Sequence, residues 1–103
     1  MIKEILTPAG IPFRRSRFPK PPEGTYVVYF DDLDTDGPDG ANRIFNHNIT
    51  LEVYEPASDD EAEAAIEAEL DAQGIHYTKQ DRYWLPTEQR YQVIYEFSYI
   101  TKN

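Results

Sequence analysis

A two-residue alternation over residues 89–100 constrains the fold of this chain more than any other feature of its sequence. The apolar series is Tyr91, Val93, Tyr95, Phe97 and Tyr99, and polar side chains at 92, 96 and 98 lie between its members. This period predicts a strand with one buried face and one wetter face. Because a chain of 103 residues without cysteine has no disulfide to stabilise it, that face has to pack in a single hydrophobic core.

Further strands are expected on both sides of a central helix. Residues 25–30 are rich in β-branched and aromatic side chains, and residues 44–54 alternate apolar and polar side chains. Residues 31–40, with five Asp, two Gly and one Pro, predict an acidic hairpin loop between these two strands. Residues 75–85 predict a third, less regular strand, which a turn at 86–88 connects to the alternating strand.

One strong helix is predicted after Pro56. Ser58 and Glu61 have the spacing of a capping box with Ser58 as the N-cap, an apolar stripe runs over residues 62–70, and Gly74 suits the C′ position. The helix is expected to have about 15 residues. The whole chain predicts a single α+β domain in the order arm-β-β-α-β-β, in which one long helix packs on one face of a mainly antiparallel sheet of about four strands.

Residues 1–24 predict a Pro-rich basic N-terminal arm. The arm holds five of the eight Pro residues, which favours extended, irregular chain with at most one short helical turn at residues 2–6. Residues 1–22 carry a net charge of +4, whereas residues 23–71 carry −14. The candidate contact site for another subunit or an acidic partner protein is Phe13, Arg14, Arg15, Arg17 and Phe18.

The acidic loop is the second candidate contact site, through Asp31, Asp32, Asp34, Asp36 and Asp39. Asp32, Asp34 and Asp36 also match the first positions of a calcium-binding loop. Arg43 stands where such a loop needs a bidentate Glu, and strands rather than helices flank it. An acidic hairpin tip is therefore the favoured interpretation, and divalent-ion binding stays a weak candidate.

Other chemistry is disfavoured. His47 and His76 are expected to be half-exposed strand residues, and the chain shows neither a nucleophile elbow nor a phosphate-binding glycine loop. We therefore expect no enzymatic activity and no cofactor. A pI of about 4.5 disfavours generic DNA binding, and we expect no specific nucleic-acid binding. The lack of an apolar run of ~20 residues disfavours a membrane span.

The pattern of elements resembles the tail-terminator (tail-completion, head–tail joining) proteins of long-tailed bacteriophages and prophages. The resemblance covers about residues 10–100 and rests on short sequence segments. These are residues 24–29, residues 48–54, the Ala- and Glu-rich residues 60–75, and the C-terminal hairpin formed by 81–84 and 90–97. Family members usually begin with a longer helix before the Pro-containing segment, whereas residues 1–10 here are short and contain Pro8.

The resemblance implies a structural, non-enzymatic protein of the virion, made in the bacterial host cytoplasm. Such proteins form a ring, commonly of six subunits, that caps the tail tube and joins it to the head. The implied partners are other copies of the chain, the tail tube protein and a head–tail connector protein. The alternative is a small acidic cytoplasmic regulator or inhibitor that binds a basic protein as a monomer.

Overall fold

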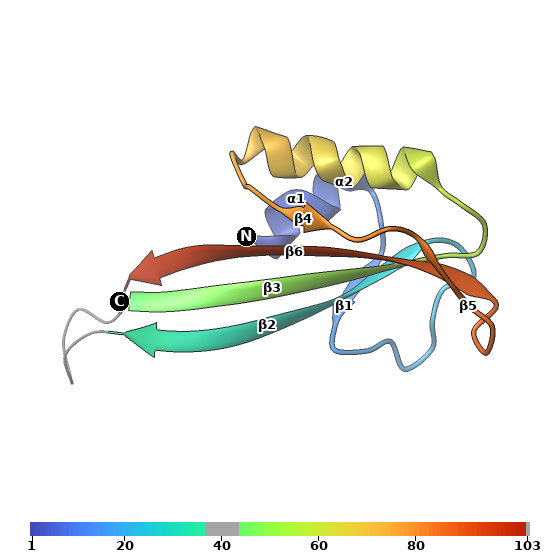
Figure 1. Cartoon of the computed structure of the whole chain (residues 1–103), viewed down its shortest axis with the longest axis horizontal. Coiled ribbons are helices and arrows are strands. Elements are labelled where there is room, and N and C mark those ends of the chain that lie inside the picture. The colour runs from blue at the N-terminus through green and yellow to red at the C-terminus, as the bar shows by residue number, and fades with distance from the viewer. Residues whose placement is uncertain (37–43, 103) are drawn as a thin grey trace.

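The computed structural model describes residues 1–36 and 44–102 and contains two helices and one six-stranded sheet (Figure 1). The elements are α1 (Ile2–Ala9), β1 (Phe13–Arg15), β2 (Tyr26–Asp36), β3 (Ile44–Glu55), α2 (Asp60–Ala72), β4 (Thr78–Lys79), β5 (Tyr83–Leu85) and β6 (Arg90–Lys102). The strand order is β1-β2-β3-β6-β4, with β5 also paired to β6. All pairings are antiparallel except β1 with β2, which confirms the predicted α+β class and mainly antiparallel sheet.

Both helices lie over the same face of the sheet (Figure 1). That face carries the odd-numbered residues of β2, β3 and β6: Val27, Val53 and Val93 are register neighbours and are fully buried. The fully buried side chains around them include Ile5, Leu6, Leu51, Ile66, Leu70 and Tyr95. The alternation in β6 therefore predicted its core-facing side correctly.

Helix α2 begins one residue later than expected. Asp59, not Ser58, is the N-cap: its Oδ1 accepts the N–H of Ala62 at 3.0 Å, while its Oδ2 accepts the Thr25 hydroxyl at 2.6 Å. The second bond ties the helix start to the sheet, which the local sequence could not show. Gly74 takes the predicted left-handed conformation (φ 68°) just after the helix. The helix has 13 residues rather than about 15.

Helix α1 contradicts the expectation of at most one short turn at the N-terminus. Ile2, Ile5 and Leu6 share one face and are buried between the sheet and α2. Burying three such side chains contributes about 1.5–3 kcal/mol each, which outweighs a cost of about 3 kcal/mol for Pro in a helix. Pro8 lies in the last turn, and Gly10 (φ 74°) ends the helix through N–H bonds to Leu6 and Thr7 carbonyls. The domain therefore has two helices instead of one.

The strands also differ from the prediction in number and length. The arm supplies β1 as an edge strand, and the expected strand at 75–85 is divided into β4 and β5, so the sheet has six strands rather than about four. Strand β2 continues to Asp36 and pairs with β3 as far as Ile44, so the acidic loop does not begin at Asp31. Asp39 lies outside the described residues.

The domain is elongated, measuring 47 × 28 × 22 Å. The helices cover one part of the sheet, and the ends of β2, β3 and β6 nearest residues 36, 44 and 102 extend beyond them (Figure 1). Helices in the described part of the chain are neither long nor apolar enough to cross a membrane.

Candidate assembly surface

Arg90 of β6 fastens the basic arm to the sheet. Its guanidinium donates to the carbonyl oxygens of Gly24 at 2.9 Å, Pro22 at 3.0 Å and Glu23 at 2.7 Å. The same group lies 5.1 Å from the ring centre of Tyr26. A rigid fork of donors suits three adjacent carbonyl groups, so the arm is held in one path across the domain.

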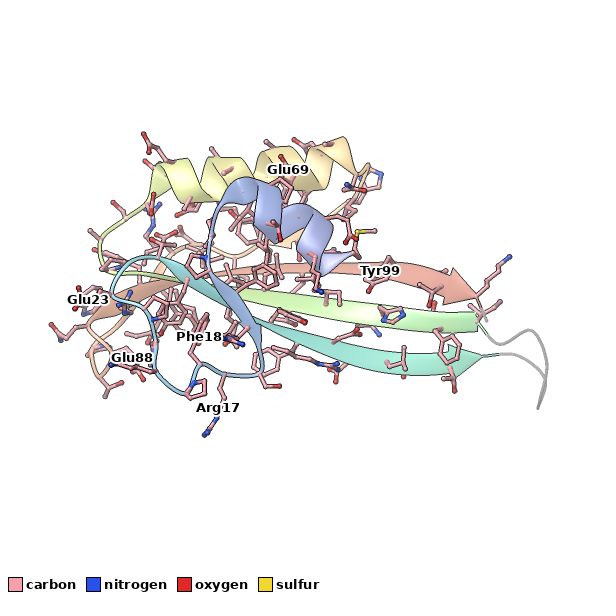
Figure 2. The ribbon with its side chains drawn as sticks, turned by 180° about the vertical axis from the view of Figure 1, so that it is seen from behind. Arg17, Phe18, Glu23, Glu69, Glu88 and Tyr99 are labelled. Carbon is pink, nitrogen blue, oxygen red and sulfur yellow. The ribbon has the colours of Figure 1, made fainter. Side chains whose placement is uncertain are left out.

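The predicted contact site has an inward and an outward half. Phe13 lies 6.4 Å from Tyr29, and Phe18 packs edge-on against Tyr26 at 5.1 Å between ring centres. Arg17 points away from the domain, whereas Phe18 lies against the sheet (Figure 2). The two Phe residues therefore anchor the arm, and the Arg residues between them face solvent.

The three cations Arg14, Arg15 and Arg17 are exposed. Arg14 lies 5.9 Å from the ring centre of Phe18, and Arg15 contacts the Asp31 carbonyl at 3.4 Å. Among residues 1–36 and 44–102, no carboxylate forms an ion pair with any of the three. Their charges are therefore available to an acidic partner surface.

An open, mostly apolar groove of about 420 Å³ lies beside this cluster. It is lined by Leu6, Thr7, Gly10, Ile11, Pro12, Phe13, Arg14 and Phe18. The C-terminal end of α1 and the arm form its walls, so it exists because the N-terminal residues are helical. An apolar floor with a cationic rim is a typical composition for a protein contact.

Asp31, Asp32, Asp34 and Asp36 lie on strand β2, and the first three divide between its two faces. Asp31, on the helix side, accepts a hydrogen bond from His47 Nδ1 at 2.9 Å. Asp32 and Asp34 are exposed on the opposite face, where Asn48 donates to Asp34 at 3.2 Å. Asp36 ends β2. In the described part of the chain no three His, Cys, Asp or Glu side chains are placed to hold a metal ion.

His47 connects three strands beyond the helices. Its Nε2 lies 2.9 Å from the Thr101 hydroxyl, its Nδ1 faces Asp31, and its ring stacks on Tyr99 at 4.5 Å. These contacts account for both ring nitrogens within the sheet. His76 is exposed in the connection after α2 rather than on a strand.

A buried acidic cluster was not anticipated from the sequence. Arg82 Nη2 donates to Glu63 and to Asp60, each at 2.8 Å, and its Nε lies 3.4 Å from fully buried Glu55. Glu55 also accepts the N–H of Asp59 at 3.1 Å. A signal was present: Glu55 continues the odd-numbered core positions of β3.

The two acids have opposite electrostatic surroundings. Burial, followed by the proximity of Glu63, raises the pKa of Glu55 to about 7. Burial would also raise the pKa of Glu63, but hydrogen bonds from Glu55, Arg82 and Lys79 hold it below its ordinary value. Below about pH 7, Glu55 therefore keeps its proton, whereas the lowered pKa of Glu63 favours its charged form.

Lys79 extends this cluster to the sheet edge. Its ammonium lies 2.9 Å from Glu63 and 2.7 Å from Glu67, and the Tyr95 hydroxyl donates to Glu67 at 2.6 Å. Burial together with the bond to Glu67 raises the pKa of Tyr95 above its ordinary range. The cluster therefore attaches α2 to β4 and β6. Two of its buried atoms, Glu55 Oε2 and Arg82 Nε, have no hydrogen-bond partner among the described residues.

Comparisons with known proteins identify the fold rather than a family. No family model matches the chain, and no curated protein matches its sequence. A chain in the structure described as the virion of a native gene transfer agent particle has a similar fold, with a TM-score of 0.64 and 18% identity. The match covers 96% of this chain and 84% of that chain, so nearly the whole α+β domain is shared.

Proposed function

We propose that the protein is a structural, non-enzymatic subunit of a phage or prophage virion and forms a tail-terminator-like ring at the head–tail junction. The observation that carries this proposal is the fold match over 96% of the chain to a component of a gene transfer agent virion. The resemblance in the order of elements and in residues 24–29, 48–54, 60–75, 81–84 and 90–97 supports the narrower assignment. In that role the ring caps the tail tube and joins it to the head connector.

The exposed cations supply a contact for the neighbouring subunit. Arg14, Arg15 and Arg17 lack an ion-pair partner in the described part of their own chain, while residues 23–71 carry a net charge of −14. A basic patch on one side and an acidic surface on another favour head-to-tail association, which closes into a ring. The exposed Asp32 and Asp34 then face the tube, the connector or the lumen.

Charge reversal tests this proposal. The triple variant Arg14→Glu, Arg15→Glu, Arg17→Glu should remain folded by circular dichroism but lose ring formation in size exclusion with light scattering and electron microscopy. Purified tail tubes are added in a second series, because a tube end can template the ring. The triple Arg→Lys variant, which retains the charge, and the exposed pair Lys3→Glu, Lys20→Glu serve as controls and should assemble.

Two outcomes oppose the proposal. If the Arg→Glu triple variant assembled as well as the native chain, Arg14, Arg15 and Arg17 would not be part of the subunit interface. A native protein that stays monomeric at every concentration and does not bind tail tubes would overturn the terminator role and favour the monomeric acidic regulator.

A further inference from the structure

The sheet has two open edges beyond the helices. Strand β1 pairs with β2 only as far as Tyr29, and β4 pairs with β6 only at Tyr95 and Glu96. From Asp31 to Asp36 on β2, and from Phe97 to Lys102 on β6, the outer side has no strand partner among the described residues. Tyr99 marks this uncovered part of β6 in Figure 2. A three-stranded ribbon with two free sides therefore projects from the domain.

The backbone hydrogen bonds at the paired ends of β2 and β6 show which residues direct their N–H and C=O groups outward. Val27 donates to Pro12 and Tyr29 accepts from Ser16, so odd-numbered residues of β2 direct their amides outward. Ile94 accepts from Gln80, so even-numbered residues of β6 do the same at the other edge. This alternation leaves unpaired N–H and C=O groups on both edges. They belong to Leu33 and Thr35 on the β2 edge and to residues 98, 100 and 102 on the β6 edge.

The charges of the two open edges, on β2 and on β6, determine which of them can pair. The β2 edge carries Asp at 31, 32, 34 and 36, so pairing of two β2 edges would bring like charges into opposition. The β6 edge has no acid after Glu96 and ends in Lys102. Apolar surface is present on both edges, since Leu33 is 51% and Ile100 is 61% exposed. The complementary partner for a β2 edge is thus a β6 edge.

We propose that the open β2 edge of one copy pairs with the open β6 edge of the next copy, so that the sheet continues from subunit to subunit. Strands β2 and β6 are both antiparallel to β3 and so run in the same direction. Copies related by rotation about an axis along the strands therefore pair these edges in parallel. The contact is heterologous, and a closed ring leaves neither edge exposed. This inference rests on the proposed ring and specifies its interface.

A proline at position 33 tests the backbone pairing. Because the Leu33 N–H points outward, Leu33→Pro removes a donor from the free edge without removing a bond to β3, and proline is tolerated on such edges. Leu33→Thr keeps the N–H and serves as the matched control. Both variants should keep native circular dichroism, but only Leu33→Pro should lose assembly at protein concentrations where the native chain forms rings.

Cysteine cross-linking tests the partner and the face. The chain has no native Cys, so single-Cys variants report only the introduced pair. Odd-numbered side chains share the helix-side face, and Leu33 is level with Tyr99 because both are register neighbours of His47. A mixture of Leu33→Cys and Tyr99→Cys proteins should therefore form a disulfide-linked dimer under oxidation. A mixture of Leu33→Cys with Ile100→Cys, which lies on the opposite face, should cross-link at least tenfold less.

The outcomes separate this inference from the ring itself. Rings formed by Leu33→Pro at the native level, or equal cross-linking of both mixtures, would overturn edge pairing while leaving the ring proposal intact. Loss of rings in Leu33→Pro alone, with selective cross-linking to position 99, supports it. Failure of the native protein to assemble even with tail tubes would overturn both.

Discussion

Replacing Glu55 by Gln tests the proton balance of the buried acidic cluster. Burial raises the pKa of Glu55 from 4.5 to about 7. Glutamine has the shape of protonated glutamic acid: its oxygen can accept the Asp59 N–H, and its nitrogen can donate to Glu63. Arg82 keeps its bonds to Glu63 and Asp60. We therefore expect Glu55→Gln to reproduce the protonated state at every pH.

The sign and size of the effect follow from proton linkage. Between pH 4.5 and about 7, the folded protein keeps a proton on Glu55 that the unfolded chain has released. The stability that Glu55 contributes is therefore full below pH 4.5 and is lost as the pH rises through about 7. At about 1.4 kcal/mol per pH unit, the difference between the folded and unfolded pKa values of Glu55 limits the lost free energy of unfolding to about 3 kcal/mol. The variant has no such loss.

Urea unfolding at pH 5 and pH 8 measures the difference. The free energy of unfolding of Glu55→Gln, minus that of the native protein, should be about 1–3 kcal/mol larger at pH 8 than at pH 5. Glu23→Gln, an exposed substitution in the arm, serves as the control for replacing a glutamate by glutamine. Parallel stability curves for Glu55→Gln and the native protein would refute the reasoning, because they would mean that Glu55 is ionised in the fold throughout.

Two further predictions concern long-range bonds. Asp59→Ala removes both the N-cap of α2 and the bond to Thr25. The free energy of unfolding, measured by urea titration, should therefore fall by about 1–2 kcal/mol. Ser58→Ala is the control and should change it by less than about 0.5 kcal/mol. Arg90→Met keeps the apolar stem but removes three hydrogen bonds to carbonyl groups of the arm, so trypsin should cleave after Arg14, Arg15 and Arg17 at least several-fold faster. An unchanged cleavage rate would show that the arm is held by its aromatic contacts alone.

Long periodic elements were predictable from the sequence. The alternation in β3 and β6 is repeated over many residues, and the stripe of α2 is bounded by acids and by Gly74, so each pattern has several independent signals. The end of α2 was correct for the same reason: a left-handed residue is required there, and Gly74 is the residue that adopts it without strain.

The missed features depend on tertiary contacts. Because Pro8 and four further prolines favour extended chain, the apolar face of α1 was not recognised as helical. The stability of α1 comes from burial under α2 rather than from local propensity. Asp-rich residues 31–36 favour a turn in isolation, yet β3 supplies cross-strand partners through His47 and Asn48. The docking of Arg90 on the arm joins residues more than 60 positions apart, which no local pattern reveals.

The positions of the two proposed contact features support a single interface. The Arg14–Arg17 cluster lies in and directly after β1, which is on the β2 side of the sheet, next to the open part of β2. At the opposite side, Lys79 attaches acid-rich α2 to β4, next to the open part of β6. When a β2 edge meets the β6 edge of the next copy, the basic cluster therefore faces the side on which the neighbour carries α2. Backbone pairing and charge attraction then act across the same boundary, and the charge-reversal and Leu33→Pro variants should fail at the same step of assembly.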